Sequence, residues 1–263
     1  MTQLADLSGI VLDIDGVLLV SSTPVEGAAA AVAELRRNRV PVRFVTNTTS
    51  TPAAGIATAL GQAGIEVGGG ELFTAGVVTA AYLREHHPGA RCLVLNDGSS
   101  EDLDGIPLAD PDDGHADVVV VGGGGPSFTW DQLNVALSCL LDGAALVAMH
   151  GSTTWRTADG LCLDGGAYAA MLEQASGVTA TVIGKPSPQM FLTAVGSMGL
   201  EPEQVAMVGD DLASDVLAAQ SLGLTGVLVR TGKFRPEVLE RSAGAPDLVV
   251  DSIVDVPPLV AGN

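Results

Sequence analysis

The sequence contains few cysteines, and they form no recognisable pair. Cys92, Cys139 and Cys162 are far apart, odd in number and without a CxxC spacing. This pattern excludes both a disulfide framework and a cysteine-based zinc site. We therefore expect three buried, inert thiols.

Basic residues and long apolar runs are also scarce. The chain has 12 Lys and Arg residues against 31 Asp and Glu residues, which gives a net charge of -19. Nucleic acids and anionic membranes are bound chiefly through Lys and Arg, so neither is an expected partner. No apolar run approaches the about 18 residues that a membrane span needs, and residues 1–7 lack the regions of a signal peptide. The sequence predicts a soluble, cytoplasmic protein.

What the sequence does contain is a regular alternation of short apolar runs and helical patterns. With 263 residues, 47% of them apolar, the chain is long enough for one core plus an insertion. Strands are expected at 9–15, 40–46, 204–209, 225–230 and 247–250, and helices at 26–38, 52–63, 188–198, 214–222 and 236–242. This order predicts an α/β fold in which βαβ units build a parallel, Rossmann-like sheet.

A block between these two parts has a complete set of elements of its own. We expect helices at 75–86, 129–141 and 166–176, strands at 91–95, 117–121 and 145–149, and a hairpin at 154–163. Together they suffice to bury a second core. The predicted organisation is a first core part at 1–70, an inserted α/β domain at 71–183 and a second core part at 184–263.

Two carboxylates, Asp13 and Asp15, follow the apolar run that begins at Gly9. A buried carboxylate without a partner costs several kcal/mol, so these residues need a reason to be there. Strand residues two apart point to the same side. Both carboxylates could therefore face one site, where a divalent metal ion would relieve their repulsion.

Three other apolar runs also lead into polar residues: Thr46-Asn47, Gly184-Lys185 and Asp210-Asp211. Taken singly, the run with Asp13 and Asp15 could be a turn and Thr46-Asn47 a helix cap. Lys185 could be a surface lysine, and Asp210-Asp211 could lie at the start of an N-capped helix. Ligands of open α/β sheets bind at the carboxyl ends of the strands. Jointly and in this order, the four runs indicate one site.

The four runs resemble the sequence motifs of the haloacid dehalogenase superfamily, which are DxDG, a Ser or Thr, a Lys, and GDxxxxD. Here they are Asp13/Asp15, Thr46, Lys185 and Asp210/Asp215. Lys185 lies 139 positions after Thr46, far more than a connecting loop needs. In this superfamily, an α/β cap inserted there marks the NagD-like branch, with a cap of the C2 type.

The resemblance implies a magnesium-dependent phosphatase that acts through an aspartyl-phosphate. Asp13 would be the nucleophile and Asp15 the general acid and base. The metal ligands would be the Asp13 carboxylate, the Asp15 carbonyl and Asp210.

The same resemblance assigns roles to the remaining motif residues. Thr46, Asn47 and Lys185 would hold the phosphate. Asp211 and Asp215 would lie in the outer layer of the site and orient Lys185 or metal-bound water. In the inserted domain, His150 is the candidate substrate contact, although a structural or surface histidine is the simpler reading.

Local runs such as Val182-Ile-Gly-Lys-Pro186 look most like the phospholysine phosphohistidine inorganic pyrophosphate phosphatases. Those relatives typically carry Ser at the position of Asp15. An alkoxide leaving group needs a proton donor, whereas phosphoramidates and pyrophosphate leave more easily. Asp15 therefore favours a small phosphate monoester, such as a sugar phosphate or nucleotide, as substrate.

Several alternatives stay open at this point. A pyrophosphate or phosphoramidate phosphatase would share all the motifs, and a phosphomutase most of them. A catalytically silent metabolite-binding protein could retain the fold, although every expected catalytic position is filled. A homodimer formed through the cap is a further expectation.

Overall fold

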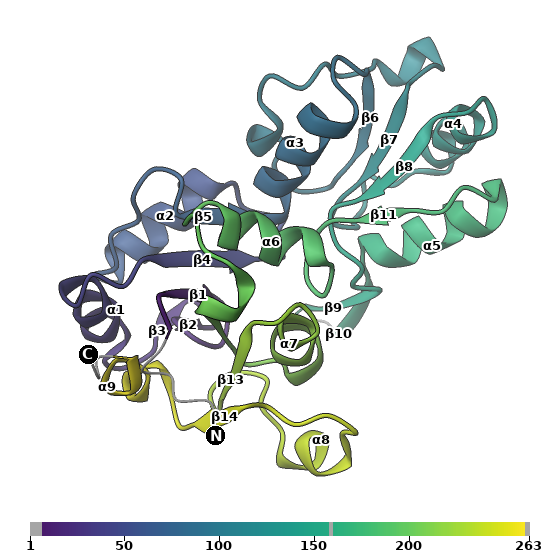
Figure 1. Ribbon diagram of the computed structural model, residues 1–263. Helices are drawn as coiled ribbons and strands as arrows, with labels where there is room; N and C mark the ends of the chain where they lie inside the picture. The colour runs from purple at the N-terminus through teal and green to yellow at the C-terminus, as the bar shows by residue number, and fades with distance from the viewer. Residues whose placement is uncertain (1–6, 158–159, 261–263) are drawn as a thin grey trace. The chain divides into compact units, whose positions relative to one another are not determined.

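The computed structural model describes residues 7–157 and 160–260, and these fall into two compact units. The first unit comprises Met1–Thr46, Ala54–Phe73 and Lys185–Asn263; the second comprises Asn47–Ala53 and Thr74–Gly184. Figure 1 labels their helices and strands. Among the described residues, no helix combines the length and apolar character that crossing a bilayer requires.

A six-stranded sheet in the order β14-β13-β12-β1-β4-β5 forms the centre of the first unit. The strands are β1 Gly9–Asp13, β4 Val42–Thr46, β5 Leu72–Thr74, β12 Val205–Gly209, β13 Thr225–Val229 and β14 Leu248–Val250. The pairs from β14 through to β4 are parallel. Every residue of β1 and β12 is buried, as expected for strands covered on both faces.

The chain order of this sheet reverses between β1 and β12. From β1 the chain builds outward through β4 to β5, and from β12 it builds the other way through β13 to β14. Such a switch point leaves a crevice outside the carboxyl ends of the two central strands. Asp13 ends β1 and Asp210 directly follows β12, so both lie at this place.

The first unit also contains several α-helices. They are α1 Ala28–Arg37, α2 Ala53–Gln62, α6 Pro188–Gly196, α7 Ala218–Gln220, α8 Pro236–Arg241 and α9 Pro257–Val260. In α1, the buried residues Ala28, Ala31, Val32 and Leu35 recur at helical spacing and form one apolar face. Helix α6 packs against β1 and β4.

The second unit is built on a four-stranded parallel sheet in the order β11-β8-β7-β6. Its strands are β6 Cys92–Leu95, β7 Val118–Val121, β8 Ala145–Ala148 and β11 Thr181–Val182, and its helices are α3 Ala75–His86, α4 Trp130–Leu141 and α5 Gly165–Ser176. Alternate strand residues such as Val119, Val121 and Leu146 form a core with α4 and α5. Figure 1 shows α3 on the other side of these strands.

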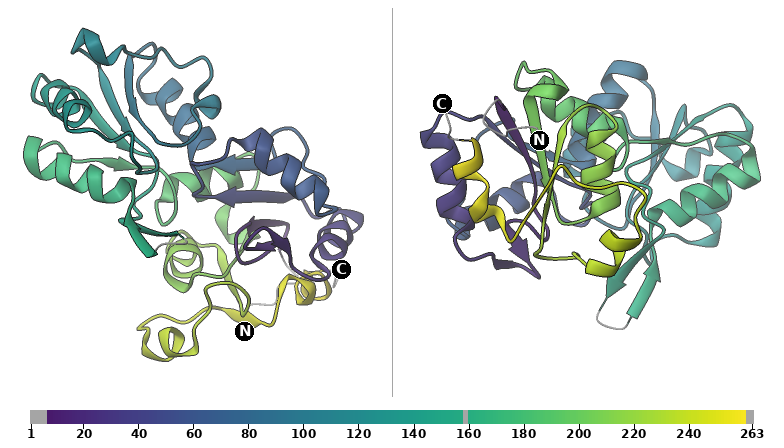
Figure 2. Two further views of the ribbon diagram at one scale, coloured as in Figure 1. Left: turned by 180° about the vertical axis from the view of Figure 1, so that it is seen from behind. Right: turned by 60° about the horizontal axis from the view of Figure 1, so that its bottom comes forward.

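A separate hairpin joins β9 Thr154–Thr157 to β10 Gly160–Leu163. In both views of Figure 2 it is a two-stranded ribbon outside the four-stranded sheet. Cys162 lies on this hairpin and is exposed, whereas Cys92 and Cys139 are buried. The expectation of three buried thiols is therefore wrong for Cys162, because a two-stranded ribbon has no layer packed over it.

The α/β fold with parallel sheets is confirmed, but some elements differ from expectation. The first strand stops at Asp13 rather than at residue 15. The helix expected at 214–222 is a π-helix at Leu212–Leu217 followed by α7. Strand β5 and the small hairpin of β2 Leu19–Val20 and β3 Thr23–Pro24 were not anticipated. Runs of two or three residues are too short to show a periodic pattern.

The segment Asn47–Ala53 is grouped with the second unit by its contacts. Ser99 N donates to the carbonyl oxygen of Thr49 at 3.2 Å. Ala53 N donates to Asp102 Oδ1 at 2.9 Å. These bonds satisfy backbone groups that a free loop would leave to water.

Candidate active site

Asp13 is the buried end of strand β1, with 5% of its surface exposed. Burial raises the pKa of its carboxyl group to about 7, because a charged carboxylate loses its hydration there. The nearby carboxylate of Asp215 adds to this rise, while Lys185 opposes it. A cation at this position would therefore stabilise the ionised form of Asp13.

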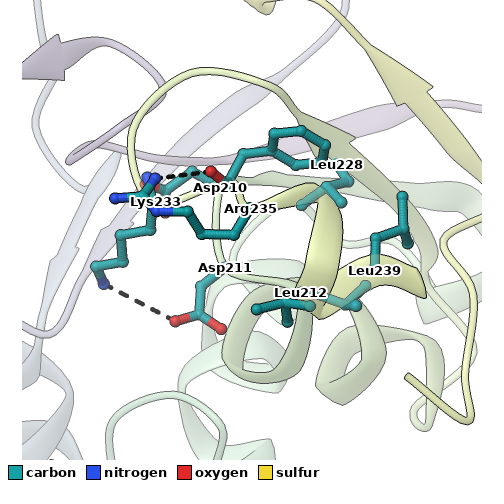
Figure 3. A pocket seen from close by; sticks show the side chains of 9 residues that line it. Asp210, Asp211, Leu212, Leu228, Lys233, Arg235 and Leu239 are labelled. Atoms are coloured by element: carbon teal, nitrogen blue, oxygen red, sulfur yellow. Dashed lines mark hydrogen bonds and ion pairs between the residues drawn. The ribbon is translucent and has the colours of Figure 1, made fainter. Parts of the chain in front are cut away.

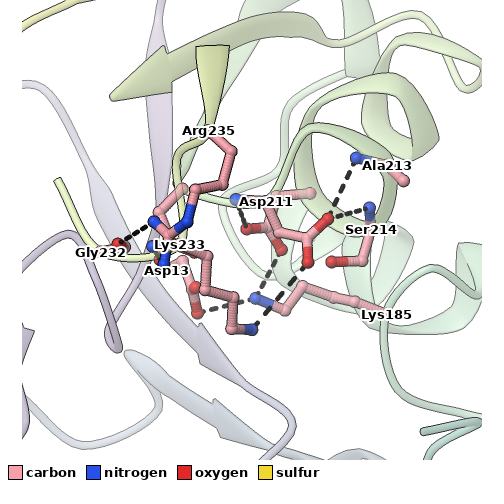
Figure 4. A network of polar contacts seen from close by, with 10 residues as sticks. Asp13, Lys185, Asp211, Ala213, Ser214, Gly232, Lys233 and Arg235 are labelled. Carbon is pink, nitrogen blue, oxygen red and sulfur yellow. Dashed lines mark hydrogen bonds and ion pairs between the residues drawn. The ribbon is translucent and has the colours of Figure 1, made fainter. Parts of the chain in front are cut away.

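Lys185 supplies one such cation, since its Nζ lies 2.7 Å from Asp13 Oδ1 and 2.8 Å from Asp215 Oδ1 (Figure 4). Burial by itself would lower the pKa of Lys185, but the two carboxylates raise it above its usual value. The ammonium group is therefore charged. Its position immediately before α6 sets it at the same edge of the sheet as Asp13.

Asp210 follows β12 and is 2% exposed. Its Oδ2 accepts a hydrogen bond from Lys233 N at 2.7 Å, whereas its buried Oδ1 has no hydrogen-bond partner in the described part of the chain. Burial raises the pKa of Asp210 to about 6, although the Lys233 N–H lowers it in part. A buried oxygen without a partner is costly unless a ligand completes it.

Asp13, Asp210 and Asp215 together could hold a metal ion. Each offers a carboxylate oxygen, and these three oxygens lie within 4.8 Å of one another. When all are ionised, Lys185 neutralises only one of the three charges. Hard divalent cations prefer oxygen ligands of this kind, and the Oδ1 of Asp210, to which no described residue donates a hydrogen bond, is suited to such an ion.

Asp15 has a different environment from Asp13. Because β1 ends at Asp13, the alternation of the strand does not extend to Asp15, which is exposed. Thr46 Oγ1 donates to Asp15 Oδ2 at 3.5 Å. The two carboxylates thus differ in burial: Asp13 is buried, whereas Asp15 is open to solvent.

Thr46 is the buried last residue of β4, and β4 pairs with β1. Its hydroxyl group therefore lies at the same sheet edge as Asp15. Asn47 is the next residue but belongs to the second unit. A role of Asn47 in phosphate binding stays a prediction.

Asp215 and Asp211, which were expected to orient Lys185 or metal-bound water, make different contacts. Asp215 Oδ1 pairs with Lys185, and its Oδ2 accepts from Asp211 N at 3.1 Å. Asp211 Oδ1 accepts from Ala213 N and Ser214 N, each at 3.1 Å, and so caps the π-helix (Figure 4). This cap fixes the start of the helix that carries Asp215.

His150 lies in the second unit, just after β8, and is 3% exposed. Its Nε2 lies 3.7 Å from Asp164 Oδ1. Burial lowers the pKa of His150 below its usual value, only partly offset by Asp164, so the imidazole is neutral at pH 7. A contact between His150 and a substrate stays a prediction.

The glycine run that begins at Gly122 packs against other atoms of the second unit. A Cβ on Gly122 would lie 2.5 Å from Asn96 Oδ1, and one on Gly125 would lie 1.9 Å from Asp97 Oδ2. Gly123 N also donates to Asn96 Oδ1 at 2.8 Å. Close packing therefore accounts for this run.

One contributor to the site was missed in the sequence, the loop Thr231–Lys233 after β13. It donates to Asp210 and to the carbonyl oxygen of Gly16. Its position could have revealed it, because it follows the predicted strand 225–230 at the same edge of the sheet as the other motifs. Threonine, glycine and lysine carry no distinctive signal of their own.

Family models match both core parts of the chain. Residues 10–104 match the model described as haloacid dehalogenase-like hydrolase, and residues 182–256 match a HAD-hydrolase-like model. The haloacid dehalogenase-like hydrolase domain-containing protein 2 of Bos taurus is 36% identical, covering 94% of this chain and 93% of its own. The phospholysine phosphohistidine inorganic pyrophosphate phosphatase of Homo sapiens is 35% identical, and the match covers 96% of this chain and 92% of the relative.

Solved structures resemble the whole chain as well. The p-nitrophenyl phosphatase from Archaeoglobus fulgidus has a TM-score of 0.88 at 29% identity and covers 97% of this chain and 100% of its own. NagD from E. coli K-12 has a TM-score of 0.84 at 28% identity, and the match covers 95% of this chain and 98% of NagD. These likenesses confirm a hydrolase of the NagD-like kind: the chain belongs to the haloacid dehalogenase-like hydrolases.

Proposed function

We propose that this enzyme is a magnesium-dependent phosphatase that hydrolyses a small phosphate monoester through an aspartyl-phosphate. The observation that carries the proposal is the buried pairing of Lys185 with Asp13, with Asp210 close by. Phosphoryl transfer depends mostly on positioning and on neutralisation of charge. Asp13 and Lys185 together provide an anionic nucleophile and a positive charge.

Asp13 would attack phosphorus and form the covalent intermediate, which divides one difficult displacement into two easier ones. Lys185, held by Asp13 and Asp215, would offset the negative charge of the phosphoryl oxygens. A magnesium ion bound by Asp13, Asp210 and the Asp15 carbonyl would supply further positive charge. Thr46 would donate its hydroxyl to a phosphoryl oxygen.

Asp15 would donate a proton to the leaving oxygen and later accept one from the attacking water. Its exposure supports this role, because an exposed side chain is open to the leaving group and to the water that attacks in the second step, from which it regains its proton. Asp13, in contrast, is buried and paired with Lys185, which favours the ionised form that a nucleophile needs. The difference in burial therefore supports separate roles for the two carboxylates.

The leading substrate class is a sugar phosphate, nucleotide or similar metabolite. The human relative named for phospholysine, phosphohistidine and pyrophosphate supports a second candidate, a P–N or P–O–P substrate. Initial rates on a panel of sugar phosphates, nucleotides, pyrophosphate and phosphoramidates would separate the two. A preference for pyrophosphate or phosphoramidate would replace the monoester assignment.

The test of the reaction class is magnesium-dependent hydrolysis of p-nitrophenyl phosphate by the wild type and by Asp13→Asn. A matched control is Asp131→Asn, which changes an exposed carboxylate in the first turn of α4. We expect Asp13→Asn to abolish turnover and Asp131→Asn to retain it. Equal turnover by the wild type and Asp13→Asn would rule out the nucleophile, and an inactive wild type would favour the silent binding protein.

A further inference from the structure

We propose that the loop Thr231–Lys233 is a positioning element that fixes the Asp210 carboxylate for metal binding. The inference rests on the proposed function in that it takes the metal site as the place where the loop acts. The loop follows β13, and Figure 3 shows it beside Asp210. Three contacts, one from each loop residue, carry the argument.

The first contact is the hydrogen bond from Lys233 N to Asp210 Oδ2, at 2.7 Å. The bond satisfies one oxygen of the carboxylate and leaves Oδ1 buried without a hydrogen-bond partner among the described residues. The Lys233 side chain is not needed for this contact, since it is 69% exposed and its Nζ lies 4.0 Å from Asp211 Oδ2. The hydrogen bond that the loop donates to Asp210 therefore comes from its backbone.

The second contact is the close approach of Gly232, which has a φ of +63°. A Cβ on Gly232 would lie 2.0 Å from Asp210 Oδ2 and 2.5 Å from Gly16 Cα. A Cβ on Gly16 would lie 1.9 Å from the same oxygen. The two glycines therefore enclose Asp210 Oδ2 and leave no room for a side chain on either.

The third contact is the hydrogen bond that Thr231 Oγ1 donates to the carbonyl oxygen of Gly16. Gly16 directly follows Asp15 and has a φ of +92°. Thr231 thereby joins the turn after β1 to the loop that holds Asp210. This hydroxyl group adds a direct link between the turn after β1 and the loop beside Asp210, in addition to the pairing of β1 with β12.

The loop has anchors of its own, so a change at Thr231 need not unfold it. Phe234 packs against the buried cluster of Leu212, Val216 and Leu228. Arg235 Nη1 donates to the carbonyl oxygen of Phe234 at 2.7 Å. A small pocket lies beside this anchor and is lined in part by Phe234 and Leu228 (Figure 3).

The expected consequence is a loss of metal affinity with little loss of substrate affinity. Orienting partners of metal ligands typically affect metal binding by about 10- to 100-fold. We expect Gly232→Ala to weaken magnesium binding by about tenfold or more, and Thr231→Val, which loses one hydrogen bond, by about fivefold. Thr231→Ser keeps the hydroxyl and should stay within about twofold of the wild type.

The test measures magnesium affinity without substrate, from the rise in Tm as magnesium is added. Circular dichroism of each variant checks that it is folded. A matched control is Thr58→Val, because Thr58 also donates its hydroxyl to a carbonyl oxygen but lies on the exposed side of α2. The second readout is the KM for p-nitrophenyl phosphate at saturating magnesium, which should change less than about twofold.

Weakened magnesium binding by folded Thr231→Val, with recovery in Thr231→Ser, would support the proposal. Unchanged magnesium affinity in folded Thr231→Val and Gly232→Ala would overturn it, as would a wild type that binds no magnesium. A wild type that binds magnesium but hydrolyses no phosphate ester would refute the proposed function alone. The magnesium titrations would then still decide the role of the loop.

Discussion

Lys185 Nζ lies 2.7 Å from Asp13 Oδ1, and both side chains are almost completely buried. Removing one partner of such a pair is strongly destabilising, because the other charge is left buried without compensation. In this enzyme, the pair also joins the proposed nucleophile to its neutralising charge. Stability and activity therefore depend on the same contact.

Replacing Lys185 by Met should reduce both stability and activity. Asp13 and Asp215 would lose their shared cation, and the free energy of unfolding at pH 7.5 should fall by about 3 kcal/mol or more. Urea denaturation measures this change. The matched control is Lys233→Met, which removes an exposed ammonium group and should shift stability by less than about 0.5 kcal/mol. Equal stability of the two variants would contradict the importance of the buried pair.

Replacing Asp210 by Asn should abolish metal activation while leaving the fold intact. The amide oxygen can still accept a hydrogen bond from Lys233 N. A neutral amide also avoids the cost of burying a charge, which is what raises the pKa of Asp210. We expect the metal-free variant to be at least as stable as the wild type, and its activity at about 1 mM magnesium to be reduced by more than about 100-fold. Thermal unfolding and a magnesium titration of the rate check both parts. Magnesium activation like that of the wild type would exclude Asp210 as a ligand.

Magnesium should stabilise the protein more at high pH than at low pH. Burial raises the folded-state pKa of Asp13 to about 7 and that of Asp210 to about 6, so protons compete with the metal below these values. Raised carboxyl pKa values also mean that protonation of these groups stabilises the metal-free fold relative to the unfolded chain, and this contribution is lost as pH rises from the usual carboxyl pKa of 3.8 to about 6 for Asp210 and about 7 for Asp13.

The measurement is the magnesium-induced rise in Tm at several pH values from about 5.5 to 8, with NaCl of equal ionic strength as the control. The rise should be largest at the highest pH and shrink as pH falls through the two pKa values. A rise that is equal across this range would show that neither carboxylate binds the ion.

Replacing Asp15 by Asn should impair hydrolysis of alkyl phosphates more than that of p-nitrophenyl phosphate. General acid catalysis contributes about 10²- to 10⁴-fold where the leaving oxygen needs a proton, and p-nitrophenolate needs little help. The measurement is kcat/KM on glycerol phosphate and p-nitrophenyl phosphate for both proteins. Because Asp15 is exposed, the variant should unfold at the same urea concentration as the wild type. Equal losses on the two substrates would argue against the proposed proton transfer.

Much of the fold could be predicted because its signals are local. The apolar runs of β1 and β4 end in a polar residue and that of β12 is followed directly by one, and the helical spacing of α1 is visible in the sequence. Parallel strands place their carboxyl ends at one edge, so Asp13, Thr46 and Asp210 could be placed there from the sequence. The structure brings Asp13, Lys185, Asp210 and Asp215 together as expected, while their roles in catalysis stay predictions.

The sequence by itself determined which strands are buried and which polar residues end them, because strand and helix periodicity depend only on near neighbours. Only the tertiary structure decided that Asp13 is buried and paired with Lys185 while Asp15 is exposed, since β1 ends between them. The contact of Thr231 with Gly16 joins residues 215 positions apart. No local pattern records such a contact, because it depends on how β13 and β1 are ordered in the sheet.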